Sequence, residues 1–395
     1  MKISISCKYF APRGGAQTFL FNFAEALLDS GHRVKVHALE VEADTDRMEV
    51  ERLRIPTVPK TLRDVAYARA SRRAMDRSDA DVAFGEQKSW GAQVVRPGGG
   101  VHLEYLRQVV KSYPLAPQRM LKAVTKPYSP KELLNLFIER KLYADPDLRC
   151  VVANSKLVRR HLLTHYPELR GRIALVYNGV NCEQYSPRLR EVYRESVRDE
   201  LNIPRDALVT VFVAFDWRRK GLATLIRSLP HLKARSGGRP VYAIVVGRGD
   251  RPLTRMLARW GGAEDRLRFV GPADPAPYYG AADVLTLPTY FDPCANVILE
   301  GLACGLPAIT TVHNGAHEML THGEDGYVMQ DPADSEELAD YLAECAHGGD
   351  LDEASAAARE LALEHTVDRM YGELEDILLA AADDASPPRG SALSL

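Results

Sequence analysis

The sequence predicts an α/β protein built on two doubly wound parallel sheets, for three reasons. Short apolar runs alternate with helix-like runs along the chain, as expected for strands that are buried on both faces of a parallel sheet. The alternation comes in two series, one ending near residue 155 and one starting near residue 208. With 395 residues, the chain exceeds the size of one common core and has room for two domains of about 150–200 residues each.

The first series begins with the alternating run 2–10, which predicts a strand rather than a signal peptide. A loop with two glycines follows, and the run 16–31 predicts a helix that ends at Gly31. Further strands are expected at 32–39, 80–85 and 149–155.

The second series begins with an apolar strand at 208–215 and a helix at about 222–234. Further strands are expected at 241–247, 267–271, 282–288 and 306–312. Doubly wound sheets bind ligands beyond the carboxyl ends of their strands, so polar motifs that follow these strands are the candidates for a binding site.

Composition excludes several classes of protein. Hydrophobic residues make up 46% of the chain and charged residues 26%, which is ordinary for a globular protein. The 51 basic and 53 acidic residues give a net charge of −2, which does not favour nucleic-acid binding. No apolar run reaches the ~18 residues of a membrane span. The six cysteines include no CxxC pair, which favours buried thiols of a cytosolic protein over disulfides or a zinc site.

Two motifs suggest phosphate binding. The stretch PRGGAQ at 12–17 places Gly14 and Gly15 between a strand and a helix, where backbone N–H groups can approach an anion. Three cations, residues 218–220, follow the strand 208–215, and an Arg and a Lys together can bind a diphosphate. The alternatives are a tight turn without a ligand and a solvated basic turn.

The stretch YFDPCANVILEGLACGLPAIT carries two carboxylates eight positions apart. Asp292 precedes a helix expected to start near Ala295, and Glu300 lies on that helix, whose apolar surface predicts burial. A buried glutamate requires a partner, and sugar or ribose hydroxyls could supply one. We expect free backbone N–H groups from Cys294 to Val297 at the helix N-terminus. The alternative makes Asp292 a helix cap and Glu300 a surface residue.

Together these motifs resemble the signature of the retaining family-four glycosyltransferases, which have the GT-B fold. The stretches ANSKLVRRHLLTHY and YNGVN and a C-terminal helix also occur in the family's order. The family usually has a glutamate at the first acidic position, whereas this chain has Asp292, whose carboxylate reaches about one methylene less.

The resemblance implies two Rossmann-like, doubly wound domains that face a central cleft. Residues 1–180 would form an acceptor-binding domain, joined by a C-terminal helix at about 366–382. Residues 181–365 would form the domain that binds the nucleotide sugar. We expect residues 383–395 to be a disordered tail.

The resemblance also implies roles for individual residues. His102, which follows three glycines, would face the transferred sugar, and Arg219 and Lys220 would neutralise the diphosphate without a metal. The D-x-D sequences at 44–46 and 79–81 are therefore expected to be polar turns. The matching catalytic positions are His102, Arg219, Lys220 and Asp292. The matching donor-binding positions are Gly14, Gly15, Arg219, Lys220, Val270, Asp292, Cys294, Ala295, Asn296, Val297 and Glu300.

Within the family, the stretches CKYFAPRGGAQ, GGGVHLEYLRQ, IERKLYA and AFDWRRKGL are most similar to lipopolysaccharide-core glucosyltransferases. The resemblance thus implies transfer of a hexose, glucose from UDP-glucose, with retention of anomeric configuration, to a glycan or lipid-linked acceptor. It implies a nucleotide-sugar substrate and no cofactor. A sugar-nucleotide epimerase of the same fold and a non-catalytic sugar-nucleotide-binding protein are the alternatives.

One segment favours contact with a membrane. Residues 105–131 combine arginines and lysines with interleaved apolar and aromatic residues and contain no acidic residue. This composition suits an anionic lipid surface, and a solvated face of the acceptor domain is the alternative. We therefore expect a cytoplasmic protein that attaches peripherally to the inner face of the cytoplasmic membrane and binds no nucleic acid.

Overall fold

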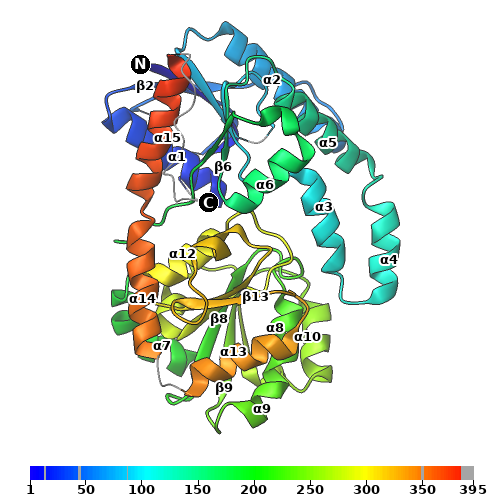
Figure 1. Cartoon of the computed structure of the whole chain (residues 1–395), viewed down its shortest axis with the longest axis vertical. Helices are drawn as coiled ribbons and strands as arrows, with labels where there is room; N and C mark the ends of the chain where they lie inside the picture. The colour runs from blue at the N-terminus through cyan, green and yellow to red at the C-terminus, as the bar shows by residue number, and fades with distance from the viewer. Residues whose placement is uncertain (13–14, 43–45, 87, 348–350, 384–395) are drawn as a thin grey trace. The chain divides into compact units, whose positions relative to one another are not determined.

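The structure, a computed structural model, describes residues 1–12, 15–42, 46–86, 88–347 and 351–383 (Figure 1). The chain divides into two compact units. The first unit comprises Met1–Arg107, Met120–Tyr177 and the chain from Asp368 onward, and the second comprises Gln108–Arg119 and Asn178–Val367. Gly14 and nearly all of the tail expected at 383–395 lie outside the described residues.

The first unit is built on a seven-stranded parallel sheet with the strand order β3-β2-β1-β4-β5-β6-β7. Strand β1 is buried from Ile3 to Cys7 and pairs with β2 on one side and β4 on the other. The strand order reverses between β1 and β4, which makes this pair the topological switch point. The strands are β1 (Lys2–Phe10), β2 (Arg33–Val41), β3 (Glu49–Arg52), β4 (Val82–Glu86), β5 (Val94–Arg96), β6 (Cys150–Ala153) and β7 (Ile173–Leu175).

The last helix of the chain packs on the first unit. Tyr371 of α15 contacts the rings of Phe19 and Phe23 of α1, with ring centroids 6.2 and 5.6 Å apart (Figure 1). These aromatic contacts bury the apolar face of α15. The helices between Met1 and Tyr177, together with the last one, are α1 (Gly15–Asp29), α2 (Arg63–Arg77), α3 (His102–Lys111), α4 (Ala116–Thr125), α5 (Pro130–Tyr143), α6 (Lys156–His165) and α15 (Val367–Ala382).

The second unit is built on a six-stranded parallel sheet with the strand order β10-β9-β8-β11-β12-β13. Here the order reverses between β8 and β11. The strands are β8 (Leu208–Ala214), β9 (Val241–Gly247), β10 (Leu267–Gly271), β11 (Val284–Thr286), β12 (Ala308–Thr311) and β13 (Gly326–Met329). The helices are α7 (Arg188–Glu200), α8 (Leu222–Ser228), α9 (Leu232–Arg235), α10 (Arg251–Trp260), α11 (Ala276–Ala281), α12 (Asn296–Ala303), α13 (Ser335–His347) and α14 (Leu351–Glu364).

The predicted fold class is confirmed, because both sheets are parallel and doubly wound. The strands that the sequence did not predict, such as β3, β5 and β7, are only three or four residues long. Such short runs carry too few residues to show a periodicity.

The segment Gln108–Arg119, which we expected in the first domain, belongs to the second unit. Arg218 holds it there: its guanidinium donates to the backbone oxygen of Val109 at 3.2 Å and to Oγ of Ser112 at 2.7 Å. The same group lies 3.9 Å from the centre of the Tyr113 ring. Arg218 is thus engaged by this segment, and not by the acidic residues near Arg219 and Lys220.

A buried carboxylate joins α7 to the second sheet. Asp283, directly before β11, accepts hydrogen bonds from the guanidinium groups of Arg194 and Arg198, each at 2.8 Å, and from the backbone N–H of Val209 at 2.9 Å. Both Asp283 and Arg198 are almost fully buried. The pKa of Asp283 lies below its usual value: burial alone would raise it, and the arginine charges and hydrogen bonds outweigh that effect.

We predict that Asp283→Asn lowers the free energy of unfolding by about 3 kcal/mol, because it leaves the Arg198 charge buried without a counter-charge. Urea denaturation followed by circular dichroism measures the change. The matched control is Glu195→Gln on α7, the helix that carries Arg194 and Arg198. It removes an exposed ion pair with Arg205 and should change stability by less than about 0.5 kcal/mol. Equal effects of the two substitutions would contradict the prediction.

Candidate functional site

Two loops meet at the switch point of the second sheet. One follows β8 and runs through residues 215–221, and the other follows β11 and runs through residues 287–295. Gly221 permits their close approach: it adopts a left-handed φ of 83°, and a Cβ atom there would lie only 1.9 Å from the backbone oxygen of Pro288. Gly221 therefore determines where the two cations before it, Arg219 and Lys220, lie.

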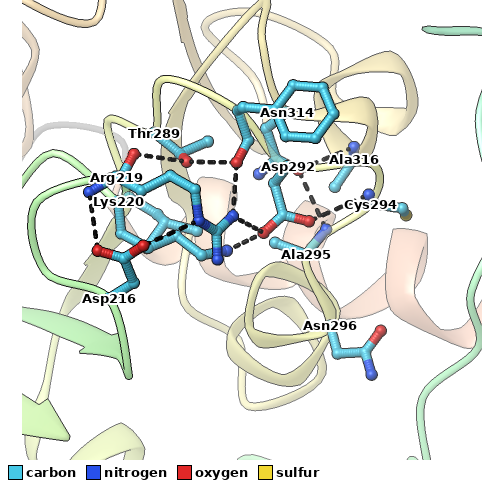
Figure 2. Close-up of polar contacts among 12 residues, drawn as sticks. Asp216, Arg219, Lys220, Thr289, Asp292, Cys294, Ala295, Asn296, Asn314 and Ala316 are labelled. Carbon is cyan, nitrogen blue, oxygen red and sulfur yellow. Dashed lines mark hydrogen bonds and ion pairs between the residues drawn. The ribbon is translucent and has the colours of Figure 1, made fainter. Parts of the chain in front are cut away.

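The centre of the site is an ion pair between Lys220 and Asp292 (Figure 2). Their side chains are only 11% and 13% exposed, so each charge depends on the other to remain in a poorly solvated place. Burial is the main cause that holds the pKa of the Lys220 ammonium well below its usual range, and the charge of Arg219 acts in the same direction. Asp216 and Cys294 oppose the shift.

Arg219 lies beside this pair and is fixed in place from several sides. Its guanidinium donates to the backbone oxygen of Phe291 at 2.7 Å and to Asp216 at 3.3 Å, and it lies 3.8 Å from the Asp292 carboxylate. Its backbone oxygen accepts from the N–H of Tyr290 at 2.9 Å. The two cations are thus held rigidly next to each other, as preorganised binding of an anion requires.

Asn314, which the sequence did not indicate, orders the loop before α12. Its side-chain oxygen accepts from the N–H groups of Ala295 at 3.1 Å and Ala316 at 3.2 Å (Figure 2). Its amide nitrogen donates to the Thr310 hydroxyl at 3.0 Å. It sits in an Asn-Gly turn after β12, which is the only signal that the sequence offers for it.

The expectation of free N–H groups from Cys294 to Val297 is wrong for two of the four. The N–H of Cys294 donates to Asp292 at 3.2 Å, and that of Ala295 donates to Asn314. Among the residues that the structure describes, the N–H groups of Asn296 and Val297 have no hydrogen-bond partner. The N-terminus of α12 therefore still offers two donors to an anion.

The Asn296 side chain turns away from the charged cluster (Figure 2). Its oxygen accepts from Nδ2 of Asn178 at 2.5 Å, and the same nitrogen of Asn178 lies 2.8 Å from the backbone oxygen of Cys294. Asn178 thus ties the start of the second unit to α12, a contact that the sequence does not reveal.

Glu300 lies on the body of α12 and is half-buried. Its Oε2 accepts a hydrogen bond from the Tyr279 hydroxyl at 2.7 Å. Burial raises the pKa of Glu300 above its usual value, Tyr279 opposes that shift, and Asp274 adds to it. The structure thus gives Glu300 a protein partner, Tyr279, where we expected ligand hydroxyls, and the side chain is half-buried rather than buried. One carboxylate oxygen remains outside this bond.

Val270 occupies a β-bulge near the end of β10. Phe269 pairs with Val245 and Gly271 pairs with Val246, so Val270 is the extra residue in its strand. A bulge leaves backbone groups outside the ladder, and bulges are frequent next to binding sites. The backbone of Val270 is thus available at the carboxyl edge of the sheet.

The remaining candidates belong to the first unit. Helix α1 begins at Gly15, directly after the first strand and its loop. His102 begins α3; its Nε2 lies 2.8 Å from Oε2 of Glu132, and its backbone N–H donates to Glu139 at 2.9 Å. Burial lowers the pKa of His102, and the Glu132 charge opposes that shift. The carboxylate partner fixes the orientation of the ring, and the role of His102 at the sugar stays a prediction.

In chemical terms, the second unit offers two fixed cations, two open N–H donors and one half-buried carboxylate along a single sheet edge. The cations and N–H groups suit a diphosphate, and the carboxylate suits hydroxyl groups. Among the described residues there is no group of three or more His, Cys, Asp or Glu side chains that could hold a metal ion.

Two family models match the chain. The model described as glycosyltransferase family 4 matches residues 13–184, and the one described as glycosyl transferases group 1 matches residues 207–347. A relative named D-inositol 3-phosphate glycosyltransferase 2, from Catenulispora acidiphila, is 31% identical over 197 residues, which are 47% of this chain and 45% of that protein. The chain thus spans about half the length of such relatives.

Solved structures share the fold over nearly the whole chain. WaaG, a glycosyltransferase involved in lipopolysaccharide biosynthesis, aligns with a TM-score of 0.79 and 20% identity over 95% of this chain and 99% of that one. HepE from Anabaena, in complex with UDP-glucose, aligns with a TM-score of 0.67 and 19% identity over 96% of this chain and 100% of that one.

We predict that Asp292→Asn lowers the free energy of unfolding by about 3 kcal/mol at pH 7, because the Lys220 ammonium loses its counter-charge. The pKa of Lys220 then falls further below that of the unfolded chain. The added loss is therefore complete below the Lys220 pKa of the folded variant and disappears as pH rises above the Lys220 pKa of the folded wild type, which itself lies well below the usual value. Urea denaturation at pH 7.0 and pH 9.5 measures both effects.

The control for this prediction is the double variant Lys220→Met/Asp292→Leu. It removes both charges at once and should recover more than half of the lost stability, because no charge remains buried alone. A loss of less than about 0.5 kcal/mol in Asp292→Asn, or an additive loss in the double variant, would contradict the coupling of the two groups.

Proposed function

Because the chain belongs to the family 4 and group 1 glycosyltransferases with the GT-B fold, we propose that it transfers a hexose, glucose from UDP-glucose, to a hydroxyl of a lipid-linked saccharide. The transfer would retain the anomeric configuration and serve the synthesis of a cell-surface polysaccharide or lipopolysaccharide. The observation that carries the proposal is the pair of fixed cations, Arg219 and Lys220, beside the open N-terminus of α12.

The diphosphate is the leaving group of this reaction, so stabilising its growing negative charge is the main task of the protein. We assign that task to Arg219, Lys220 and the N–H groups of Asn296 and Val297. A bound diphosphate adds negative charge next to Lys220, which raises the pKa of its ammonium and keeps it protonated. The cations supply the charge that a metal ion supplies in other sugar-nucleotide enzymes.

The other donor-site residues receive roles from their positions. We propose that the carboxylate oxygen of Glu300 outside the Tyr279 bond accepts from the ribose hydroxyls, and that the backbone at the Val270 bulge binds the base of the nucleotide. Asp292 and His102 would contact the transferred sugar, as the family resemblance implies. The acceptor hydroxyl would attack the sugar from the face that the phosphate leaves, so the departing phosphate can take the proton of that hydroxyl. The proposal therefore needs no pair of carboxylates of the kind that glycosidases use.

A lipid-linked acceptor would make attachment to a membrane useful, and α4 has the surface for it. No residue of α4 is buried. Four apolar or aromatic side chains of this helix and the turn after it are at least 60% exposed: Met120, Leu121, Val124 and Tyr128. Arg119 and Lys122 lie among them on the same helix. We propose that α4 rests on anionic lipid at the inner face of the cytoplasmic membrane.

Among the described helices none is both long and apolar enough to cross a bilayer.

Two measurements test the proposed reaction. Melting shifts with UDP-, GDP- and ADP-sugars identify the base, with UDP-glucose expected to give the largest shift. UDP release from that donor, with and without heptose-terminated lipopolysaccharide, then separates transfer from simple binding. Conversion of the donor to its epimer without an acceptor would favour an epimerase, and binding without turnover would favour a non-catalytic protein.

We predict that Glu300→Gln weakens UDP binding about tenfold or more, because it removes a charge-assisted hydrogen bond to the ribose. Stability at pH 7 should not fall, since the raised pKa of Glu300 means that its charge is unfavourable in the folded state. Any gain in the free energy of unfolding over the wild type is present above the pKa of Glu300 in the folded state. It vanishes as pH falls toward about 4.3, the pKa of a glutamate in the unfolded chain. Calorimetric titration with UDP and melting at pH 7 and pH 4.5 measure this.

The control is Glu337→Gln on α13, because Glu337 also accepts a hydrogen bond from a tyrosine, Tyr341, at 3.0 Å. It repeats the chemical change away from the proposed site and should leave UDP affinity unchanged. Equal UDP affinity of the wild type and Glu300→Gln would remove Glu300 from the ribose site.

For the membrane surface, we predict that Arg119→Gln/Lys122→Gln lowers binding to phosphatidylglycerol vesicles about tenfold or more, since each cation near an anionic surface contributes about 1 kcal/mol. Vesicle co-sedimentation at low and high salt measures the change, and salt should weaken the wild type more than the variant. The matched control, Arg159→Gln/Arg160→Gln on α6, removes the same charge from another exposed surface. If the control loses as much binding, net charge rather than α4 is responsible.

A further inference from the structure

The switch point of the first sheet carries charged side chains that the proposed donor site does not use. Lys8 lies near the carboxyl end of β1, Glu86 ends β4, and Arg96 ends β5. β1 and β4 are the neighbours between which the strand order reverses, and Glu86 and Arg96 are register partners. These groups therefore gather where a doubly wound sheet binds its ligand.

The cations around this point already have protein partners. Asp64 of α2 accepts from both Lys8 and Lys88, at 2.6 Å from the latter, and Lys88 also donates to Oδ1 of Asn135 at 2.9 Å. Lys88 holds this position with a left-handed φ of 78°, which is costly for a residue with a side chain. Arg96 is buried, with its guanidinium 4.3 Å from the centre of the Phe19 ring.

Glu86 differs from its neighbours. Within the described part of the chain its carboxyl group has no hydrogen bond and no ion pair, although the side chain is half-buried. Burial raises the pKa of Glu86 to about 7, against the opposing charges of Arg96 and Lys8. Cys7 and Tyr67 also face it, and its charge raises the pKa of both. Half-buried carboxyl groups normally have hydrogen-bond partners, so the Glu86 carboxyl is a candidate to bind a ligand.

We propose that Glu86 binds a hydroxyl group of the saccharide acceptor at the switch point of the first sheet. The ligand class follows from the partners: Lys8 and Lys88 both pair with Asp64, whereas among the described residues the Glu86 carboxyl has no such partner, and a carboxyl suits a hydroxyl donor rather than a phosphate. This inference rests on the proposed function, because it assigns the acceptor side of the same reaction. Glu86 would thus position the acceptor independently of the residues that hold the donor.

The test uses saturation-transfer NMR on the full chain with methyl α-glucopyranoside and methyl α-mannopyranoside as probes. The wild type should bind at least one of them, and Glu86→Ala should weaken that binding about tenfold or more. The carboxylate is the better acceptor, so wild-type binding should strengthen as pH rises from 6 to 8, whereas Glu86→Gln should show no such dependence. A purely structural role of Glu86 would not produce this pH profile.

The matched control is Glu40→Gln, because Glu40 lies near the end of the neighbouring strand β2 and pairs with Arg63. It should leave glycoside binding unchanged. Melting curves establish that each variant is folded. Absence of glycoside binding by the wild type, or wild-type binding by folded Glu86→Ala, overturns the inference. Absence of UDP-sugar binding by the wild type instead contradicts the proposed function.

Discussion

The site in the second unit depends on a lysine ammonium and an aspartate carboxylate that are both almost removed from water and must therefore stay paired. Neither charge of the Lys220–Asp292 pair is stable there alone. The surrounding structure holds the pair together: Gly221 lets the two loops meet, and Asn314 fixes the backbone that follows Asp292. Because Lys220 retains its charge through a neighbour rather than through water, it can interact strongly with an incoming diphosphate.

The two units use the same place in their sheets for different chemistry. In the second unit the strand order reverses between β8 and β11, and the loop that follows β8 carries Arg219 and Lys220. In the first unit it reverses between β1 and β4, where Lys8 and Lys88 both pair with Asp64 and the carboxyl group of Glu86 has no hydrogen bond or ion pair within the described part of the chain. Cations suit a diphosphate and a carboxyl suits a hydroxyl, so this difference matches a donor site in one unit and an acceptor site in the other.

The sequence predicted the fold class and the family, because both depend on local patterns: apolar strands in series and short motifs at their carboxyl ends. It did not predict the partners of those motifs. Lys220 and Asp292 are 72 positions apart, and Asn178 contacts Cys294 across 116 positions, so no local pattern records these contacts. The same limit explains the error at Cys294 and Ala295, whose N–H groups are bonded by Asp292 and Asn314. Glu86 also escaped notice, because its significance depends on side chains from neighbouring strands.

The most direct measurement is the turnover of Lys220→Gln with the sugar nucleotide that gives the largest melting shift. Glutamine removes the positive charge and keeps a hydrogen-bond donor for Asp292, and Arg219 remains 3.8 Å from that carboxylate. The variant should therefore be less stable but folded, while kcat falls about hundredfold or more. Arg235→Gln, an exposed cation of the same unit that pairs with Glu336 and Asp340, should keep the wild-type rate. A folded Lys220→Gln protein that releases the nucleotide as fast as the wild type would contradict the role of Lys220 in stabilising the departing diphosphate.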